Sequence, residues 1–480
     1  MTKSWSRPAA PLPRVAPSLT IDRDVSHRSR GAFPMSQRNL ILLWLATAVS
    51  YACYVRGEQN PYARHVASGL AAIDEGSLER IPSRELFDGA MRGMVRVLEQ
   101  HGDEHSQFLS DEQADPLRSE IRQQFGGIGV RLRFVGDPPR LVIAFPPEAG
   151  TPAANADLRA GDHILAIDER PTEKLVMDEV IGLMRGEPGS TVRLTIQHED
   201  ERASRTLELV REIIEIESVF GDKRGPDGQW DFQLPADPRI AHVRVVMFGD
   251  RTALEFAHAI EQSQAGGARA VVLDLRDNSG GALEAAVAVC DLVLPAGLTV
   301  VETRGRDGEL RRRYDTSGMG RYLNLPLAVV VNRDSASAAE IVAASLQDYR
   351  RAAVVGERTF GKGTVQQLVP VGNKSLLKLT WASFWRPSGV NLHRMADAPA
   401  DGSWGVLPDA GLELRLSDEE LEAYVNYRRQ RDLGDAAYLM EAGAKDGDST
   451  PSDEFIDRQL MIAVDHLRAQ LDARQSPLAP

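Results

Sequence analysis

Hydrophobic and polar positions divide the chain into regions of different pattern. From residue 62 to 109, apolar residues recur at three- and four-residue spacing, the period of amphipathic helices, with a second helix opening at Ser83. Between residues 121 and 210, short apolar runs alternate with turns rich in glycine and proline. This pattern predicts a compact β-rich module of roughly 90 residues, a typical size for one domain. From Ile240, apolar strands alternate with helices, so the sequence predicts a layered α/β core.

Individual elements of the core follow from continuous apolar runs. Runs at 270–275 and 327–331 predict buried strands, because a strand covered on both faces has no polar alternation. The chain after Leu412 is charged and helical, and residues 456–471 form a terminal amphipathic pattern. Further strands are expected at 241–246, 352–355 and 364–369, and helices at 252–262, at 281–292 and from Ser337.

An uncharged apolar stretch at residues 40–55 is the one membrane candidate in the sequence. It is slightly shorter than the roughly 17–25 residues of a spanning helix. Basic residues outnumber acidic ones before it, which favours a cytoplasmic N-terminus and an exported body. A cleaved signal peptide, with translation starting at Met35, and a buried core helix remain as alternatives. Residues 1–38 are rich in proline, serine and arginine and predict a disordered cytoplasmic tail.

Charge is distributed unevenly along the 480 residues. The net charge is −13, but residues 1–38 carry seven Lys or Arg against two Asp, so the chain after residue 55 sums to −18. A protein region with this negative charge is not expected to bind the phosphate groups of nucleic acid. The two cysteines, Cys53 and Cys290, have no partners at metal-ligand spacing, which supports neither a disulfide framework nor a zinc site.

Ser337 begins a predicted helix in the segment Asp334-Ser-Ala-Ser-Ala-Ala-Glu-Ile341. Ser337-Ala-Ala-Glu340 fits a capping box, in which the serine and the glutamate satisfy first-turn N–H groups. A hydroxyl at this position also sits in the positive field of a helix N-terminus. The N–H of Ala338 would then point toward an oxyanion developing on a substrate.

Lys362 lies between two glycines in Gly356-Glu-Arg-Thr-Phe-Gly-Lys-Gly363, which nearly spells a phosphate-binding loop. Gly363 supplies no hydroxyl for Mg²⁺, and the following residues predict a strand where a phosphate loop requires a helix. On a strand, Lys362 and Gln366 would share a face, so that Gln366 holds the amine in position. A neutral lysine base needs its pKa lowered to about 7, which costs about 4.6 kcal/mol. Burial beside Phe360, Leu368 and Trp381 is expected to lower the pKa of Lys362 in this way.

A third polar turn, Asp274-Leu-Arg-Asp-Asn-Ser-Gly-Gly281, ends a buried strand. Its glycines leave backbone N–H groups open, with Gly281 at the start of the next helix. A second oxyanion donor is therefore expected here, with an ordinary strand-to-helix turn as the alternative.

The β-rich module resembles a PDZ domain. The resemblance rests on Gly127-Ile128-Gly129-Val130 as a carboxylate-binding loop and on Ala160-Gly-Asp-His-Ile-Leu-Ala-Ile-Asp168. Backbone N–H groups of such a loop catch a peptide's C-terminal carboxylate, and the peptide strand pairs with an exposed edge. The alternative is that these glycines form only a hairpin turn.

Taken together, the three turns resemble the carboxyl-terminal processing peptidases, also called tail-specific proteases. Their D-L-R-x-N-x-G-G, S-A-S-A-x-E-I and T-F-G-K-G-x-V-Q motifs occur here in order, and the likeness spans roughly residues 60–470. The resemblance implies Ser337 as nucleophile rather than Ser335, Lys362 as general base and Gln366 as its orienter. Gly281 and Ala338 would lend the oxyanion N–H groups. Ser279, in place of a common proline, and the segment from Trp381 to Trp385 depart from the family pattern without removing a catalytic group.

The resemblance implies a layered α/β, crotonase-like protease core with an inserted PDZ domain and helical terminal segments. The expected division is a tail at 1–38, a transmembrane or signal segment at 39–55, a helical region at 56–112, a PDZ domain at 113–212, the protease core at 213–430 and a helical tail at 431–480.

The expected function is an exported, membrane-anchored serine endopeptidase that cuts proteins near their C-termini, with the PDZ domain binding the substrate's free C-terminus. Expected partners are such substrates and, through residues 39–55, the membrane. No metal or organic cofactor is needed, and the oligomeric state, a homo-oligomer included, stays open. A catalytically inactive PDZ scaffold in the cell envelope is the alternative from another class.

Overall fold

The computed structural model describes residues 41, 43–51, 60–136, 138–148, 150–198, 201–225, 228–372, 374–395, 398–399, 402–433 and 455–475. The chain forms two compact units, residues 1–87 and 88–480. Residues 1–38, expected to be a disordered tail, lie outside the described part, as do 39, 40, 42 and 52–55 of the expected membrane segment. None of the helices in the described ranges combines the length and the hydropathy that crossing a bilayer requires.

Two helices follow in the N-terminal region, as expected from the apolar spacing. Helix α2 runs over Pro61–Gly76, where the Asn60 side chain accepts a hydrogen bond from the N–H of Tyr62. Helix α3, Ser83–Gln100, begins at the residue expected. The next elements belong to the larger unit: strand β1 (Gln107–Leu109) and helix α4 (Asp111–Arg122), both of which contact β21 (Ser375–Trp385).

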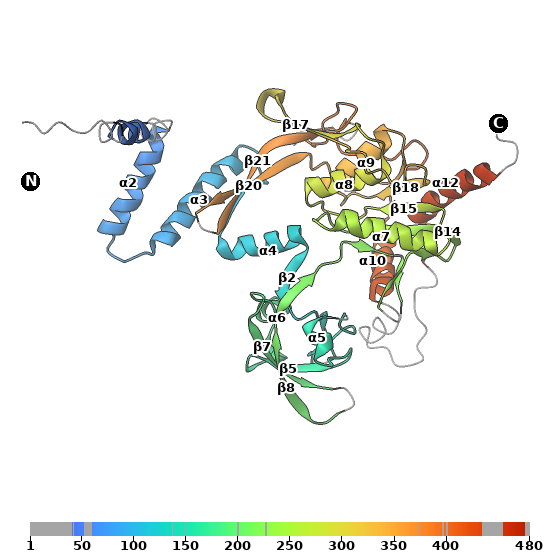
Figure 1. Ribbon diagram of the computed structural model, residues 1–480, viewed down its shortest axis with the longest axis horizontal. Coiled ribbons are helices and arrows are strands. Elements are labelled where there is room, and N and C mark those ends of the chain that lie inside the picture. Colours follow the sequence, from blue (N-terminus) through green and yellow to red (C-terminus); the bar gives the residue numbers. More distant parts are fainter. Residues whose placement is uncertain are drawn as a thin grey trace, which may run out of the picture. The chain divides into compact units, whose positions relative to one another are not determined.

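The β-rich module is an antiparallel sheet in the order β3-β4-β5-β7-β8, with β6 beside β5 (Figure 1). Its inward side chains form a separate core that includes Ile143, Leu194 and Ile196. A two-stranded ribbon of β2 and β9 lies at the two points where the chain enters and leaves the module. The bounds are β2 Gln124–Gly127, β3 Leu132–Val135, β4 Arg140–Ile143, α5 Pro152–Asn155, β5 His163–Ile167, β6 Arg170–Pro171, η1 Thr172–Lys174, α6 Met177–Met184, β7 Thr191–Gln197, β8 Ser204–Val210 and β9 Glu212–Glu215.

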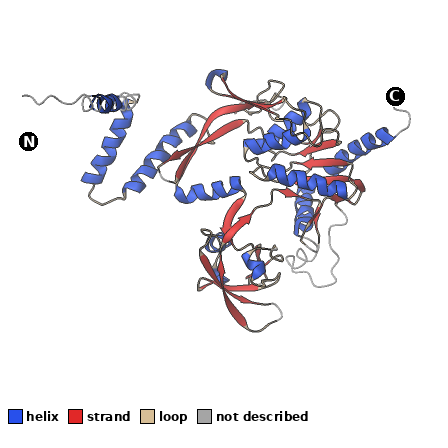
Figure 2. Cartoon of the chain, viewed as in Figure 1, coloured by secondary structure: helices blue, strands red, loops and turns tan. Residues whose placement is uncertain are grey.

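The α/β core is built on a second sheet, in which β14, β15, β18 and β19 are parallel (Figure 2). Short antiparallel strands, β10 and β13, pair with β14. The predicted strands at 270–275 and 327–331 are confirmed as β15 and β18, and all of their residues are buried. The bounds are β10 Val219–Phe220, β11 Lys223–Arg224, β12 Trp230–Asp231, β13 Gln233–Leu234, β14 Asp237–Val245, α7 Thr252–Ala265, β15 Ala270–Asp274, α8 Leu283–Val293, β18 Leu327–Val331, α9 Ala338–Asp348 and β19 Ala353–Gly356.

Alternate side chains of this sheet enter two different hydrophobic clusters. Val271, Leu273 and Val329 face α7, α8 and α9. Ala270, Val272 and Val330 face the C-terminal helix α12, Arg458–Gln475. Because strand side chains alternate between faces, both faces must be covered by helices, which explains the continuous apolar runs. Helix α12, expected as part of a helical tail, is thus a layer of the core.

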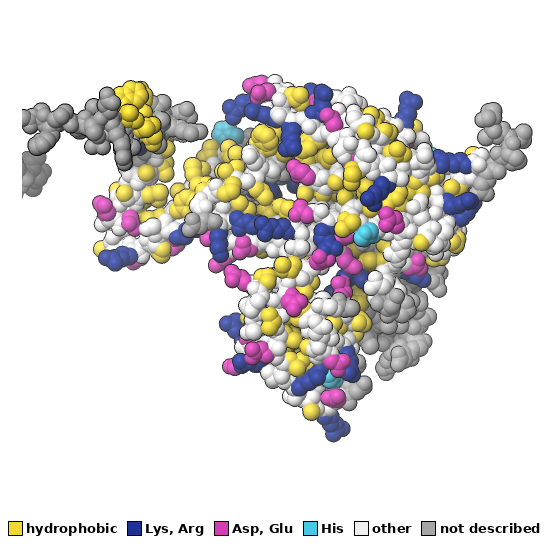
Figure 3. Space-filling view, viewed as in Figure 1, with side chains coloured by type: hydrophobic (Ala, Val, Ile, Leu, Met, Phe, Trp, Pro, Cys, Tyr) yellow, Lys and Arg dark blue, Asp and Glu magenta, His cyan; other side chains and the backbone are white. Residues whose placement is uncertain are grey.

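An antiparallel sheet lies beside the core, in the order β1-β21-β16-β17, with β20 also paired to β21. Strand β20 is Thr364–Val371, β16 is Thr299–Arg304 and β17 is Leu310–Asp315. The remaining helical elements are η2 (Arg306–Gly308) and α10 (Asp418–Leu433). On the face drawn in Figure 3, acidic and basic side chains are intermixed over these elements. The layered α/β architecture with a separate β-rich module is as predicted.

Candidate active site

Ser337 is the residue before the first turn of α9 and has a strained backbone. Its φ of 56° and ψ of −114° are rare for a residue with a Cβ, so the surrounding structure must hold it there. No first-turn N–H of the described helix donates to its hydroxyl, so the serine half of the expected capping box is not formed. The glutamate half is: the N–H of Ser337 donates to Glu340 Oε2 at 2.9 Å. The Ser337 hydroxyl is therefore available for chemistry.

Ser335 is excluded as the reactive serine by its environment. Its side chain is fully buried. The hydroxyl donates to the carbonyl of Leu275 at 2.8 Å and accepts from the N–H of Asn332 at 2.9 Å. These bonds tie the turn after β18 to the end of β15, which is a structural role.

Glu340 joins the Ser337 turn to the Lys362 segment. Its carboxylate is fully buried and accepts four hydrogen bonds. Oε2 accepts from the N–H groups of Ser337 (2.9 Å) and Lys362 (2.8 Å), and Oε1 accepts from Thr359 Oγ1 (2.6 Å) and the N–H of Gly361 (2.7 Å). Burial raises the pKa of Glu340 to about 7, against the four donors that favour the charged form. One carboxylate thus fixes the backbone of both candidate catalytic residues.

Lys362 lies just before β20 and not on it, which corrects the expectation of a strand position. Gly361 has a φ of 87°, and a Cβ at Gly363 would lie 2.1 Å from the backbone nitrogen of His393. The segment therefore packs too closely and turns too sharply for regular strand pairing. Burial, and then the Lys378 ammonium, lower the pKa of Lys362, while the Glu340 carboxylate opposes them. This is the direction that a lysine base requires.

Two of the three apolar side chains expected to bury Lys362 are themselves partly open to solvent. Phe360 is 52% exposed and Trp381 is 37% exposed. The Lys362 charge acts on a histidine: burial and then this charge lower the pKa of His105. The backbone of Gly363 packs against that of His393. His105 comes from the segment before β1, which sequence reasoning did not connect with the site.

Gln366 is on the same face of β20 as Thr364, as the period of two predicts. Its amide nitrogen donates to Thr364 Oγ1 at 2.9 Å and lies 3.4 Å from Thr380 Oγ1. Thr380 in turn donates to Asp103 Oδ1 at 2.9 Å. Asp103 also accepts from Ser106 Oγ at 2.6 Å, so residues 103–106 hold this part of the sheet. The contact between Gln366 and the Lys362 amine stays a prediction.

The turn after β15 lies against Ser337. A Cβ at Gly280 would lie 2.7 Å from the Cβ of Ser337 and 3.1 Å from the nitrogen of Ala338. Gly280 and Gly281 have φ values of 108° and 137°, and Gly281 packs on the backbone of Phe248. Helix α8 begins at Leu283, two residues later than expected. Within the described residues, no hydrogen bond uses the N–H of Gly281 or Ala338.

A buried network of ion pairs supports the turn after β15. Arg276, 1% exposed at its side chain, pairs with Asp274 at 2.6 Å and with Asp457 at 2.8 Å. Both ring nitrogens of His242 face carboxylates, 3.1 Å from Asp222 and 2.9 Å from Asp274. Asp457 also accepts from the N–H of Leu460 at the start of α12. The C-terminal helix is therefore bonded to the strand that leads to Gly281.

The β-rich module has a groove of its own, about 280 Å³ in volume. Gly127, Ile128, Gly129 and Val130, the expected carboxylate-binding loop, line one side of it. Helix α6 supplies Met177, Ile181 and Met184 opposite, and Arg185 stacks on Phe125 with its guanidinium carbon 4.5 Å from the ring centre. An apolar groove beside a glycine-rich loop fits an extended peptide end.

Comparison with known proteins assigns the chain to a family. Residues 239–410 match peptidase family S41, and residues 146–198 match a PDZ domain. A carboxy-terminal-processing protease from Bartonella bacilliformis is 30% identical over 403 residues, covering 83% of this chain and 86% of its own. The chain belongs to peptidase family S41.

The chain is also similar to two further proteins. A carboxyl-terminal-processing protease from a Synechocystis strain is 30% identical over 406 residues, with 84% of this chain and 87% of its own covered. A solved photosystem II D1 C-terminal processing protease is 26% identical, covering 74% of this chain and 94% of its own, with a TM-score of 0.40. The family S41 chain is a serine endopeptidase of the C-terminal-processing type and carries a PDZ domain.

The structure of this S41 peptidase also removes the phosphate-loop alternative. Lys362 is followed by strand β20, so no helix N-terminus faces the position that a phosphate would occupy. Groups of histidine, cysteine, aspartate and glutamate able to hold a metal are absent from the described ranges. The sequence shows Glu340 three residues after Ser337, at the capping-box position. Its four hydrogen bonds could not be predicted from this position, because they include the N–H of a residue 22 positions further along the chain.

Proposed function

We propose that Ser337 and Lys362 are the catalytic pair of this S41 peptidase. The Ser337 hydroxyl attacks the scissile carbonyl while the neutral Lys362 amine takes its proton. The tetrahedral oxyanion accepts hydrogen bonds from the N–H groups of Gly281 and Ala338. Lys362 then gives the proton to the leaving amine, and water hydrolyses the ester formed with Ser337. The observation that carries the proposal is the Glu340 carboxylate, bonded to the N–H groups of both residues.

Gln366 acts in this scheme as a positioning residue. Its amide nitrogen is occupied by Thr364, which leaves the amide oxygen to accept a hydrogen bond from the Lys362 ammonium. The link through Thr380 to Asp103 restricts the rotation of the Gln366 side chain.

The PDZ groove, in this proposal, binds the free C-terminus of a protein substrate and gates the site. Backbone N–H groups of residues 127–130 take the carboxylate, and the apolar side chain of the last residue enters between them and α6. The ribbon of β2 and β9 connects the groove to the core, so occupation of the groove has a direct mechanical route to the protease.

The expected location is the cell envelope, with the catalytic body on the periplasmic or extracytoplasmic side. The uncharged stretch within residues 39–55 and the excess of basic residues before it support a membrane anchor in this orientation. Fractionation followed by digestion with an external protease tests it. Recovery of the intact chain in the cytosolic fraction would contradict the proposed location.

Cleavage of an unfolded protein substrate tests the catalytic assignment. The Ser337→Ala and Lys362→Ala variants should lose activity while retaining the wild-type melting temperature. Ser388→Ala, at an exposed serine in a turn of the core, is the matched control and should retain full activity. Equal cleavage by wild type and Ser337→Ala rejects the assignment, and peptide binding without turnover by the wild type would favour the PDZ scaffold.

Peptide substrates with free and amidated C-termini test the role of the PDZ groove. Ile181→Asp places a charge in the groove and should raise KM for the free peptide toward that of the amidated one. Val210→Asp, at an exposed position on β8, is the control. No preference for the free C-terminus in the wild type would contradict the proposal.

A further inference from the structure

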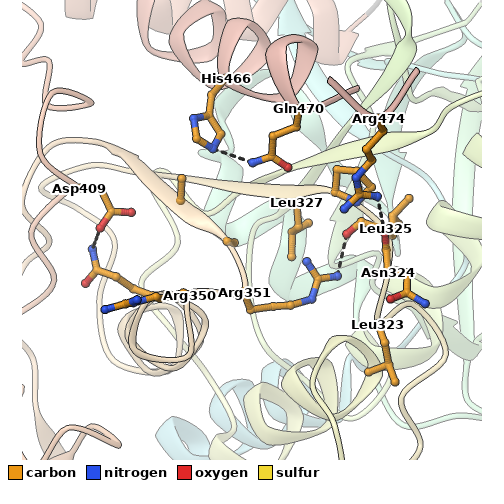
Figure 4. A pocket seen from close by; sticks show the side chains of 14 residues that line it. Leu323, Asn324, Leu325, Leu327, Arg350, Arg351, Asp409, His466, Gln470 and Arg474 are labelled. Carbon is orange, nitrogen blue, oxygen red and sulfur yellow. Dashed lines mark hydrogen bonds between the residues drawn. The ribbon is translucent and has the colours of Figure 1, made fainter. Parts of the chain in front are cut away.

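A hollow lies on the core, away from the residues assigned to catalysis. It has a volume of about 500 Å³, within the range of small-molecule sites. Its walls come from the turn after α9, the loop before β18 and the last turns of α12 (Figure 4). The lining also includes the apolar residues Leu325, Pro326 and Ala352. We call it the basic pocket because Arg350, Arg351, His466 and Arg474 line it.

Positive charge exceeds negative charge in the basic pocket, because three arginines and a single carboxylate line it. In the described residues, no ion pair involves Arg350, Arg351 or Arg474. Many other arginines of the core are paired with a carboxylate, such as Arg276 and Arg386. The one carboxylate in the wall, Asp409, is already engaged. It accepts from Gln347 Nε2 at 2.9 Å and from the N–H of Val354 at 2.8 Å.

Arg351 is fixed in place by carbonyl groups alone. Its Nε donates to the carbonyl of Val293, and one terminal nitrogen donates to those of Tyr322 and Leu325, each at 2.8 Å. Arg474 reaches the carbonyl of Asn324 in the same loop at 3.0 Å. Burial, and then the Arg474 charge, lower the pKa of Arg351. Two guanidinium groups are therefore bonded to the same loop through uncharged carbonyl groups.

Arg350 follows the C-terminal end of α9 in the left-handed region, with a φ of 52°. The N–H groups of Arg350 and Arg351 donate to the carbonyls of Gln347 and Leu346, each at 2.8 Å, so the backbone that carries both arginines is fixed by the end of the helix.

A neighbouring hollow extends the same positive region. It has a volume of about 480 Å³, shares Asn324, Leu325 and Arg474 with the basic pocket, and adds Arg269. Figure 4 shows His466, Gln470 and Arg474 projecting from α12 on one side, with Arg350 and Arg351 on the other. Gln470 is bonded to His466, with 2.9 Å between their side-chain nitrogens.

We propose that the basic pocket binds a small, multiply charged oxyanion, either a phosphate-bearing compound or a polycarboxylate. The guanidinium groups of Arg350, Arg351 and Arg474 bind its oxygens, and the apolar residues of the lining contact its carbon or ester portion. Guanidinium forks suit both phosphate and carboxylate geometry. This site goes beyond the proposed peptidase function, because it involves neither the residues of catalysis nor the PDZ groove.

Calorimetric titration of the full-length protein tests the proposal. Pyrophosphate and citrate are the probes, at an ionic strength held constant with sodium chloride. The double variant Arg350→Gln/Arg474→Gln should weaken binding about tenfold to a hundredfold, because two charge-assisted contacts are lost. The matched control is Arg170→Gln/Arg202→Gln, which removes the same charge from exposed positions of the PDZ module. Tighter binding of pyrophosphate or of citrate identifies the class of ligand.

Two outcomes overturn the proposal. One is no binding of either probe to the wild type, and the other is equal weakening in both double variants, which indicates diffuse charge attraction. If the pocket variant does not fold, modification of Arg474 by phenylglyoxal in the wild type replaces it. Protection of Arg474 by the bound probe supports the site, and unchanged modification rejects it. Cleavage of the unfolded substrate is measured in parallel and should be the same for both double variants, so failure of this site leaves the proposed catalysis unaffected.

Discussion

The N–H of Ser337 and the N–H of Lys362 donate to the same oxygen, Oε2 of Glu340. The two residues are 25 positions apart in the sequence, and their backbones are fixed relative to each other by this one atom. A carboxylate that accepts four donors inside the protein cannot move without breaking strong, charge-assisted hydrogen bonds. Glu340 therefore fixes the backbones of the proposed nucleophile and the proposed base relative to each other.

Replacing Glu340 by glutamine should reduce kcat strongly and change KM little. In glutamine, an NH2 group replaces one carboxylate oxygen of Glu340. Its N–H groups would face the two N–H or O–H donors that now donate to that oxygen. We expect a loss of about 2–4 kcal/mol in transition-state stabilisation, or about 30- to 1,000-fold in kcat/KM. Asp291→Asn is the control, because Asp291 is also buried and accepts from Ser317 and Gly318 in a loop unrelated to catalysis. Equal kinetic losses in both variants would show a general effect of destabilisation.

Activity should rise with pH through neutrality. Lys362 must be neutral to act as base, and its pKa is lowered toward the working range by burial and by Lys378. Glu340, with a pKa of about 7, must be ionised to hold both loops. A log plot of kcat/KM against pH is therefore expected to have a steep acidic limb. The limb should become shallower in Glu340→Gln; an identical slope in the variant would contradict the assignment.

Folding stability, unlike activity, should fall as the pH rises through neutrality. The folded-state pKa of Glu340 lies above the ordinary 4.5, so folding binds protons to this group. Its favourable contribution is complete below about pH 4.5 and is lost as pH rises through about 7, a change of about 3 kcal/mol. Urea denaturation of wild type and Glu340→Gln at several pH values measures the difference. A wild type with the same pH dependence as the variant would show that Glu340 does not titrate in this range.

Alanine substitution of the two serines of the motif should affect stability at one position and catalysis at the other. Ser335→Ala removes a buried hydroxyl that bonds Leu275 and Asn332, which should cost about 1–3 kcal/mol of stability. Its kcat per folded molecule should stay near that of the wild type. Ser337→Ala should show the reverse, wild-type stability and no turnover. A folded, inactive Ser335→Ala protein would mean that the turn after β18 tolerates no change.

Gly280→Ala should impair catalysis beyond its effect on folding. The added methyl group would lie 2.7 Å from the Cβ of Ser337, and the residue has a φ of 108°. Gly267→Ala is a matched control: its φ is 100° but the space around it is open. Both should lose about 1–2 kcal/mol of stability from the left-handed backbone, while only Gly280→Ala should lose kcat. Thermal melting and initial rates distinguish the two effects.

Local patterns in the sequence were sufficient for much of this architecture. The apolar runs gave strands β15 and β18 because both faces of the sheet are covered, and Ser83 was correctly placed at the start of α3. The motifs placed Ser337 at the start of a helix and the Gly280–Gly281 turn after a buried strand, and the fold brings these two together. In each case the determining interaction is local: a strand period, a helix start or a glycine turn.

Long-range relationships were not available from these patterns. The amphipathic pattern after residue 456 indicated a helix but not that it covers one face of the central sheet. The displacement of Lys362 from β20 depends on the close approach of Gly363 to His393. The support of Thr380 by Asp103 joins positions 277 residues apart. Such contacts follow from tertiary packing, which periodicity does not encode.

The ion pair between Arg276 and Asp457 should couple the C-terminal helix to the oxyanion turn. Asp457→Asn keeps a group that can accept from the N–H of Leu460 but removes one of the two carboxylates that neutralise the buried Arg276. A loss of about 2–4 kcal/mol of stability is expected, because a buried charge becomes partly unpaired. Asp465→Asn, in an exposed pair on the same helix, should change stability by less than about 1 kcal/mol. Since Arg276 lies five residues before Gly281, the Asp457 variant should also have a lower kcat at unchanged KM. Wild-type melting together with wild-type kcat in Asp457→Asn would show that α12 covers the sheet without holding the turn.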